Sequence, residues 1–411
     1  MRQWMVAAKK ADFYAIAEKF HVDPVVARII RNREVIGEKN IRIYLGGNLS
    51  DLSDPHQMKD MDRLVEILAQ KIRKQVHIRI IGDYDVDGVT SSHLFLTALR
   101  RVGAKVDVVI PHRIQDGYGL SLHLLQQAKE DGVDTILTCD NGIAAIDEIA
   151  WAKAQKMTVL VTDHHAVPFE EHEGRRTEKK SLADAVVNPH QQDCGYPYKE
   201  LCGAGVAWNV IRVLYENYDM DKREAEDLLD FVAMATVCDV MSLTGENRIL
   251  VKEGLKRIRH TKNIGLQALM QACNVQPENI SAYHFGYVLG PCVNATGRLD
   301  TARHALRLFE TGQETEAEEI ARDLVDLNQE RKELTLQGVE MAKKLCEEGG
   351  YENDPVLVLF LPDVHESIAG LIAGRIREMY NRPVFVLTRG EEGVKAVSYT
   401  HLRAHETELH L

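Results

Sequence analysis

Residues 77–88 read His-Ile-Arg-Ile-Ile-Gly-Asp-Tyr-Asp-Val-Asp-Gly, so three carboxylates at alternate positions follow directly on an apolar run. The carboxylates are Asp83, Asp85 and Asp87. Carboxylates this close repel one another, and such a cluster at a strand end is unfavourable unless cations neutralise it. The stretch therefore predicts a buried strand that presents a metal site at its carboxyl end.

Strand and helix patterns alternate from this stretch onward. Apolar runs predict strands at 77–81, 106–110, 135–139, 157–162 and 185–187. Helices are expected between them at 89–101, 120–130 and 143–155. Apolar strands separated by helices of this length indicate an α/β fold, a parallel sheet with helices on both faces. Ligands of such sheets bind beyond the carboxyl ends of the strands.

The chain divides by pattern into five segments. We expect an N-terminal helical segment at 1–75, the sheet domain at 76–270, a helical connector at 271–348, an incomplete second α/β domain at 349–396, and a tail at 397–411. The connector contains a long charged helix over 314–347, and the second domain has strands at 356–360 and 384–388 around a helix at 366–380.

The tail, residues 397–411, fits none of these patterns. Two strands and one helix cannot bury both faces of a sheet, so we interpret the tail as the non-native end of a truncated chain. A rival interpretation is that His401 and His405, four residues apart, bind a metal on a helix, but no third ligand is placed nearby.

Bulk composition is that of a soluble globular protein, with 411 residues, 45% of them hydrophobic and 27% charged. The formal net charge of -12 argues against a nonspecific polybasic binder, although a local basic face could still bind nucleic acid. Seven cysteines without a Cys-x-x-Cys pair suit a reducing cytosol. We expect a cytoplasmic protein with no signal peptide and no membrane span.

Polar side chains follow the other expected strands as well. Arg113 lies just after the second strand, Asp140 after the third, and Asp163-His164-His165 after the fourth. Because the carboxyl ends of parallel strands share one edge, these groups should converge. Carboxylates with an imidazole suit two divalent ions roughly 3.5 to 4 Å apart, and this donor set favours Mn²⁺ or Mg²⁺. The expected function is metal-dependent chemistry on phosphate esters.

Two other motifs share parts of this pattern. Residues 83–88 match the opening of a calcium-binding helix-loop-helix, but the required acid at position twelve is Leu94 here. Residues 85–88 also resemble the Asp-x-Asp-Gly of haloacid dehalogenase-type phosphatases, in which Asp85 would be a nucleophile. That family needs a lysine and a later acidic pair, whereas this chain offers Asp140 and histidines, so it is kept as a remote alternative.

With Asp163-His164-His165 in place, the chain resembles the DHH family of phosphoesterases, and within it the RecJ-type bacterial exonucleases specific for single strands. The resemblance covers about residues 1–396. It rests on motifs at 82–91, 116–121, 138–142, 162–165, 187–190, 236–241, 290–299 and 365–370.

The resemblance implies two ligand sets that share Asp140. Asp85, Asp140 and Asp239 would hold one metal, and Asp87, Asp140 and His164 the other. Asp239 is a residue that the pattern alone would not select, because it ends an expected helix and would ordinarily be a solvated acid.

The resemblance also implies roles for residues around the ligands. Asp83 and Asp163 would orient ligands, and His165 would contact the scissile phosphate or assist the leaving group. Four further residues match positions that the family places near the nucleic-acid strand or its phosphates: Arg113, Asn294, Arg298 and His365.

The implied activity is 5′-to-3′ hydrolysis of single-stranded DNA to mononucleotides with two Mn²⁺ or Mg²⁺ ions, in DNA repair and recombination. A helicase and a single-strand-binding protein are the implied partners of a monomer. Alternatives are a DHH phosphodiesterase acting on short oligonucleotides or cyclic dinucleotides, or an inactive truncated fragment. The chain departs from the family after Lys395, where Ala396-Val397 replace a Gly-Ser-Gly-Arg-Ser-like turn.

Overall fold

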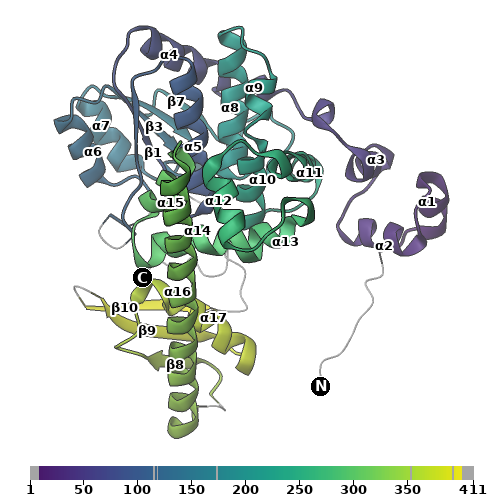
Figure 1. The fold of residues 1–411 in the computed structure, drawn as a ribbon, viewed down its shortest axis with the longest axis vertical. Helices are drawn as coiled ribbons and strands as arrows, with labels where there is room; N and C mark the ends of the chain where they lie inside the picture. Colours follow the sequence, from purple (N-terminus) through teal and green to yellow (C-terminus); the bar gives the residue numbers. More distant parts are fainter. Residues whose placement is uncertain are drawn as a thin grey trace.

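The computed structural model describes residues 9–399 except 114–115, 118, 173–174, 352–353 and 391–392. A large unit built on a parallel sheet lies above a small unit built on a second sheet, and the long helix α16 (Glu314–Gly349) runs from one to the other (Figure 1). The helices α1 (Phe13–Phe20), α2 (Pro24–Asn32) and α3 (Glu38–Gly46) stand beside the large unit.

The large sheet has five parallel strands in the order β2-β1-β3-β4-β7. Their bounds are β1 (Ile78–Ile81), β2 (Val106–Val109), β3 (Thr135–Cys139), β4 (Thr158–Thr162) and β7 (Ala185–Val187). The expected α/β fold with a parallel sheet is confirmed, and every expected strand begins and ends within one residue of its observed bounds.

Helices cover both faces of this sheet because alternate strand residues point to opposite sides. Leu137 and Leu160 pack into the core on one face, and Ile136 and Val159 into the core on the other. The first core includes residues of α4 (Met61–Arg73), α5 (Val86–Arg101), α8 (Gly203–Asn217) and α10 (Leu229–Cys238). The second includes residues of α6 (Leu122–Glu130) and α7 (Ile146–Ala154).

Two local differences from expectation have clear causes. Helix α5 begins at Val86 instead of residue 89, because the carboxylate of Asp85 caps it by accepting from the Gly88 backbone N–H at 3.1 Å. An antiparallel hairpin, β5 (Phe169–His172) with β6 (Arg175–Glu178), was not expected. Its strands carry charged residues and lack apolar alternation, so no period-2 signal marks them.

The large unit contains further helices, of which α11 (Gly245–Arg257) packs on α10. The others are α9 (Arg223–Glu226), α12 (Ile264–Ala272), α13 (Ala282–His284), α14 (Gly290–Leu299) and α15 (Ala302–Glu310), with a π-helix, η5 (Phe285–Leu289), between α13 and α14. Short 3-10 turns lie at η1 (Leu49–Asp51), η2 (Pro55–Gln57), η3 (Ile258–His260) and η4 (Pro277–Asn279).

Helix α16 contributes to two hydrophobic cores, which agrees with the long helix expected over 314–347. Ala317 and Leu324 near its start pack into the core of the large unit, and Val339 and Ala342 pack into that of the small unit. Across the described residues, no helix combines the length and the apolar character needed to cross a bilayer.

The small unit has three strands in the order β10-β9-β8. They are β8 (Leu357–Phe360), β9 (Val384–Gly390) and β10 (Gly393–Tyr399), packed with α17 (Ala369–Tyr380) after the turn η7 (Glu366–Ile368). The expectation of two strands was therefore wrong. Three residues assigned to the tail, 397–399, pair with β9 in β10, while His401 and His405 lie outside the described residues.

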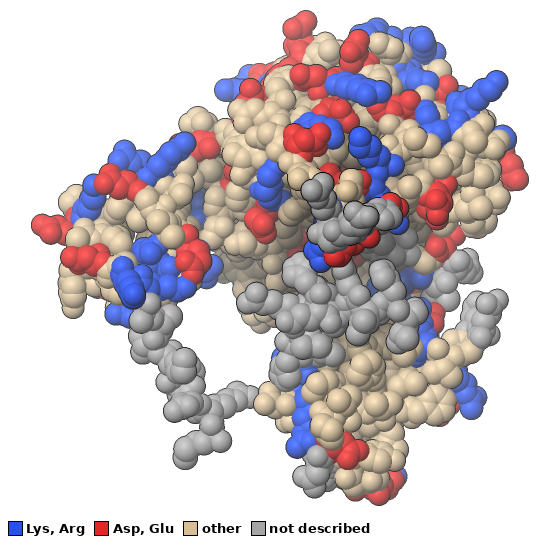
Figure 2. All heavy atoms as spheres, turned by 180° about the vertical axis from the view of Figure 1, so that it is seen from behind, with Lys and Arg blue, Asp and Glu red and all other residues tan. Residues whose placement is uncertain are grey.

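Both signs of charge are interspersed over the face of the molecule seen in Figure 2. No patch of a single sign dominates this face, and the net charge of the whole chain is -12. A nucleic-acid site on such a protein needs a local source of positive charge.

Close packing of α11 on α10 depends on Gly254. A Cβ added there would lie 2.2 Å from the Leu229 carbonyl oxygen and 2.3 Å from the Ala233 Cβ. We expect Gly254→Ala to lower the free energy of unfolding by about 1–3 kcal/mol through overpacking. Gly312→Ala is the control, because a Cβ there meets nothing within 4 Å. Equal chemical denaturation midpoints for the two variants would contradict this account.

Candidate metal centre

The register of the parallel sheet brings the strand ends level with one another. Ile81 lies opposite Thr138, and Cys139 opposite Thr162, so the residues that follow continue in the same alignment. Asp83, Asp140 and Asp163 therefore leave neighbouring strands at one edge, and all three are almost fully buried. Residues 80 apart in sequence meet there because parallel strands place their carboxyl ends together.

Asp140 adopts a left-handed backbone conformation, with φ of 61°. This region is uncommon for a residue with a side chain and is typical of functional sites held by their surroundings. Gly203 at the start of α8 approaches it closely, since a Cβ on Gly203 would lie 2.6 Å from the Asp140 Cβ. The absence of a side chain at Gly203 lets helix α8 reach the strand edge.

Asp87 lies in the first turn of α5 and is held by the N-terminus of α8. Its two carboxylate oxygens accept from the backbone N–H groups of Gly203 at 2.6 Å and Ala204 at 2.8 Å. The partial positive charge of a helix N-terminus stabilises a carboxylate there. Two helices thus fix this side chain in one orientation.

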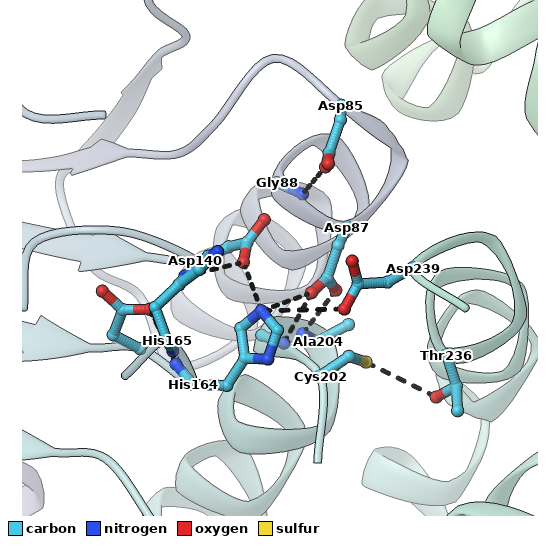
Figure 3. A network of polar contacts seen from close by, with 12 residues as sticks. Asp85, Asp87, Gly88, Asp140, His164, His165, Cys202, Ala204, Thr236 and Asp239 are labelled. Carbon is cyan, nitrogen blue, oxygen red and sulfur yellow. Dashed lines mark hydrogen bonds and ion pairs between the residues drawn. The ribbon is translucent and has the colours of Figure 1, made fainter. Parts of the chain in front are cut away.

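His164 occupies the middle of the cluster (Figure 3). Its Nε2 lies 3.0 Å from Oδ1 of Asp140, 3.6 Å from Oδ2 of Asp87 and 3.7 Å from Oδ2 of Asp239. Asp239 reaches this point from the C-cap of α10. Strand ends β3 and β4 and helices α5 and α10 therefore supply one group of polar atoms.

Asp163 organises the loop that carries the two histidines. It accepts backbone hydrogen bonds from Ile143, His164 and His165, and its Oδ1 lies 2.8 Å from Nδ1 of His165. Burial opposes charge on both partners, but the bond between them outweighs it. It lowers the pKa of Asp163 below its usual value and raises the pKa of His165 to about 9.

At four other carboxyl groups, burial and nearby negative charge oppose ionisation. Burial, with the charge of Asp85, raises the pKa of Asp83 to about 7. Burial, with Asp87 and Asp85, raises the pKa of Asp239 to about 8, and the same causes raise that of Asp140 well above its usual value. Burial and Asp87 also raise the pKa of Asp85. Like charges in a poorly solvated pocket require added positive charge to ionise together.

This donor set fits divalent cations. Oδ1 of Asp83 is buried and accepts no hydrogen bond from the described residues, and the buried Oδ1 of Asp140 meets only the imidazoles of His164 and His165 among them. Three groups of potential ligands have donor atoms within 4.8 Å of one another: Asp83, Asp85 and Asp140; Asp87, His164 and Asp239; and Asp140, His164 and His165. Oxygen-rich sites with few nitrogens suit Mg²⁺ and Mn²⁺.

The grouping differs in two respects from the sets implied by resemblance. Asp239 lies with Asp87 and His164, whereas Asp85 was its expected companion. Asp83, expected to orient ligands, itself offers an oxygen beside Asp85 and Asp140. The cause is the direction of Asp85, whose Oδ1 turns to the Gly88 N–H at the start of α5 (Figure 3).

A polar cleft of about 260 Å³ adjoins these carboxylates. It is lined by Asp83, Tyr84, Asp85, Arg113, Asn294 and Arg298. The Arg113 guanidinium lies 4.8 Å from the centre of the Tyr84 ring, a cation–π contact. Asn294 accepts from the Val86 N–H at 3.1 Å, so it also holds the start of α5 in place.

Arg298 connects this cleft to the small unit. Its Nη1 donates to the Ser367 carbonyl oxygen at 2.8 Å, and burial together with Arg113 and Arg331 lowers its pKa to about 10. A second cavity, about 300 Å³, lies here and includes Arg113, Arg298 and Lys395 in its lining. His365 lines neither cavity, and its Nδ1 contacts Oγ of Ser367 at 2.7 Å.

Sequence reasoning missed three contributors to this region. Gly203 was not identified, although a Gly-Ala-Gly run opening a helix is a signal for close backbone approach. Ser367 acts through its contact with Arg298 of the large unit, and Lys395 lines the second cavity together with Arg113 and Arg298. No local pattern in the sequence predicts contacts of that kind.

Comparisons with known proteins agree with this geometry. A profile described as the DHH family, N-terminal domain, matches residues 77–236, which places the parallel sheet and its carboxylates in that class. The chain is 34% identical over 398 residues to the single-stranded-DNA-specific exonuclease RecJ of Haemophilus influenzae, covering 92% of this chain and 67% of that protein. It belongs to the RecJ family of single-stranded-DNA-specific exonucleases.

Other relatives support the same membership. RecJ of Bacillus subtilis is 32% identical, and the match covers 92% of this chain but only 46% of that protein. A crystal structure of exonuclease RecJ bound to manganese superposes with a TM-score of 0.72 at 32% identity, covering 85% of this chain and 84% of that one. RecJ of Thermus thermophilus with Mn²⁺ gives 0.74 at 28% identity, covering 94% and 53%. Because the chain belongs to the RecJ family, the alternative of a haloacid dehalogenase-type phosphatase is excluded.

Replacing Gly203 tests how the cluster is held. The added methyl of Gly203→Ala would collide with Asp140, so we expect roughly 10–100-fold weaker Mn²⁺ binding by calorimetry. Gly205→Ala is the matched control in the same helix, since its Cβ would meet only the movable Leu201 side chain at 3.3 Å. Equal metal affinities in the two variants would show that the close approach is unimportant.

The raised pKa values predict a pH-dependent effect of metal. The pKa of Asp239 is about 8 in the folded state, against 3.8 as its ordinary value. Its contribution to stability is therefore full below about pH 4 and is lost as pH rises through 8. We expect Mg²⁺ to raise the melting temperature more at pH 8 than at pH 6, because the ion replaces the missing protons.

Asp239→Asn supplies the control for this titration. Without the carboxylate, Mg²⁺ should raise the melting temperature by more similar amounts at pH 6 and at pH 8. Equal shifts at pH 6 and pH 8 in the unsubstituted protein would be inconsistent with the raised pKa values.

Proposed function

We propose that this chain hydrolyses phosphodiester bonds of single-stranded DNA, working 5′-to-3′ and releasing mononucleotides, in DNA repair and recombination. The observation that carries the proposal is the buried cluster of carboxylates and imidazole, with an unpartnered oxygen on Asp83, lying directly beside an arginine-lined cleft. Membership of the RecJ family supports the substrate and the reaction class.

Five residues would hold two Mn²⁺ or Mg²⁺ ions: Asp85, Asp87, Asp140, His164 and Asp239. When bound, divalent cations supply the positive charge that lowers the pKa of an attacking water and screens the phosphodiester. RecJ crystal structures contain manganese or magnesium, which supports this choice of ions.

His165 is proposed to act on the leaving group. Asp163 keeps the imidazole protonated at neutral pH and holds it through Nδ1, and 43% of the His165 side chain is exposed. An imidazolium so placed can donate a hydrogen bond to a phosphate oxygen or a proton to the departing one. Asp83 and Asp163 would keep the loops that carry the ligands in position.

The positive side of the cleft is proposed to guide the strand. Arg113 and Arg298 would contact phosphates, and Asn294 and His365 would position the adjacent backbone segments. On this proposal the domain at 76–270 carries the chemistry. The segments at 271–348 and 349–396 then close the cleft around a single strand, excluding duplex on steric grounds.

Cellular context follows from the same family. We propose a monomeric cytoplasmic enzyme that receives unwound strands from a helicase in the presence of a single-strand-binding protein. Because the chain spans 46% to 67% of the curated relatives named above, these partners remain part of the proposal.

The test is a gel assay with end-labelled single-stranded and duplex DNA in Mn²⁺, Mg²⁺ or EDTA. We expect a 5′-phosphorylated single strand to be degraded from its 5′ end with either metal, and no cleavage in EDTA. Asp140→Ala should lower the rate about 10³-fold, as loss of several kcal/mol of charge stabilisation requires. Asp147→Ala, an exposed acid on α7, should cleave normally.

Cyclic dinucleotides and short oligoribonucleotides provide the comparison with other DHH enzymes. Faster turnover of these than of single-stranded DNA would replace the proposed substrate class. Full activity of Asp140→Ala would remove the metal centre from the mechanism altogether.

A further inference from the structure

A large cavity lies at the opposite end of the two helices that carry Asp87 and Asp239. Its volume is about 740 Å³, within the range of ligand sites, and α5, α10, α15 and η3 contribute to its wall. Arg100 in that wall follows Asp87 by 13 residues of continuous helix, or about 20 Å. None of the potential metal ligands lines the cavity.

The floor of this cavity contains a buried polar group that no described contact explains. His93 is 6% exposed, and its Nδ1 has no hydrogen-bond partner among the described residues. Burial lowers its pKa to about 3, so the ring is neutral and carries one donor and one acceptor nitrogen. Its ring centre lies 4.4 Å from that of Phe231 and 5.8 Å from that of Phe309.

The rest of the lining carries more basic than acidic side chains. Five basic residues line it: Arg100, Arg101, Lys256, Arg257 and Lys262. Three acids accompany them, of which Asp230 is buried and satisfied by the Thr261 hydroxyl at 2.7 Å, and Glu310 pairs with Arg100 at 3.4 Å. Arg101, Lys256 and Arg257 pair with Glu224, Glu253 and Glu226, so Lys262 and the exposed Arg100 are the basic groups most available to an anion. An apolar floor with a few polar groups and a positive wall suits an anion that carries a flat ring.

We propose that this cavity binds a nucleoside phosphate, with its base against the floor at His93, Phe231 and Phe309 and its phosphate at Arg100 and Lys262. The base supplies a planar face and hydrogen-bonding edges for the imidazole, and the phosphate supplies charge for the rim. The site is separate from the metal centre and does not depend on the proposed nuclease activity.

Calorimetry with thymidine monophosphate and adenosine monophosphate in EDTA tests the proposal without metal at the carboxylates. We expect one site per chain. The double variant R100A/K262A should weaken binding about tenfold, a loss of 1.4 kcal/mol. R223A/K344A is the control, since it removes two exposed cations that lie outside the cavity. Thymidine and inorganic phosphate should each bind more weakly than the nucleotide.

Two further variants locate the bound nucleotide. His93→Phe keeps an aromatic ring in the core, so circular dichroism can verify folding while binding is expected to fall. Arg113→Ala alters the cleft beside the carboxylates and should leave the affinity unchanged. Unchanged affinity in R100A/K262A, loss of binding in Arg113→Ala, or phosphate binding as tightly as the nucleotide would each overturn the proposal.

Discussion

Repulsion among buried carboxylates is the constraint on which the rest of this structure depends. Asp83, Asp85, Asp140 and Asp239 reach one poorly solvated pocket beside Asp87, where burial and nearby negative charge oppose ionisation of these four side chains. Backbone N–H groups at the start of α8 and the imidazole of His164 relieve part of that cost. The remainder requires cations, so the same groups whose repulsion destabilises the fold would create affinity for metal.

Two arginines lie directly beside the carboxylate cluster. Arg113 and Arg298 lie in the adjoining cleft, and Arg298 also donates to Ser367 of the small unit. A protein with a net charge of -12 can thus present a local basic surface to a polyanion. Helix α16 contributes side chains to the hydrophobic cores of both units and so connects the two sides of this region.

Much of the fold could be predicted because the signals are local. The β1, β3 and β4 strands are short and mainly apolar, and each is followed by a polar group whose placement then follows from parallel topology. The hairpin β5–β6 was missed because its strands show no apolar alternation, and the third strand of the small sheet was missed because residues from 397 onward were assigned to the tail. The roles of Asp239 and Ser367 could not be read locally, since each acts across a contact between distant segments.

By itself the sequence determined the strands of the parallel sheet, where their carboxyl ends lie, and that acids and histidines gather there, because apolar periodicity and turn residues act over a few positions. Only the tertiary structure decided which oxygens face one another. Asp85 turns to cap α5 while Asp239 joins Asp87 and His164, since helix capping and close glycine contacts set side-chain directions. Those directions depend on packing between elements, and no local pattern encodes it.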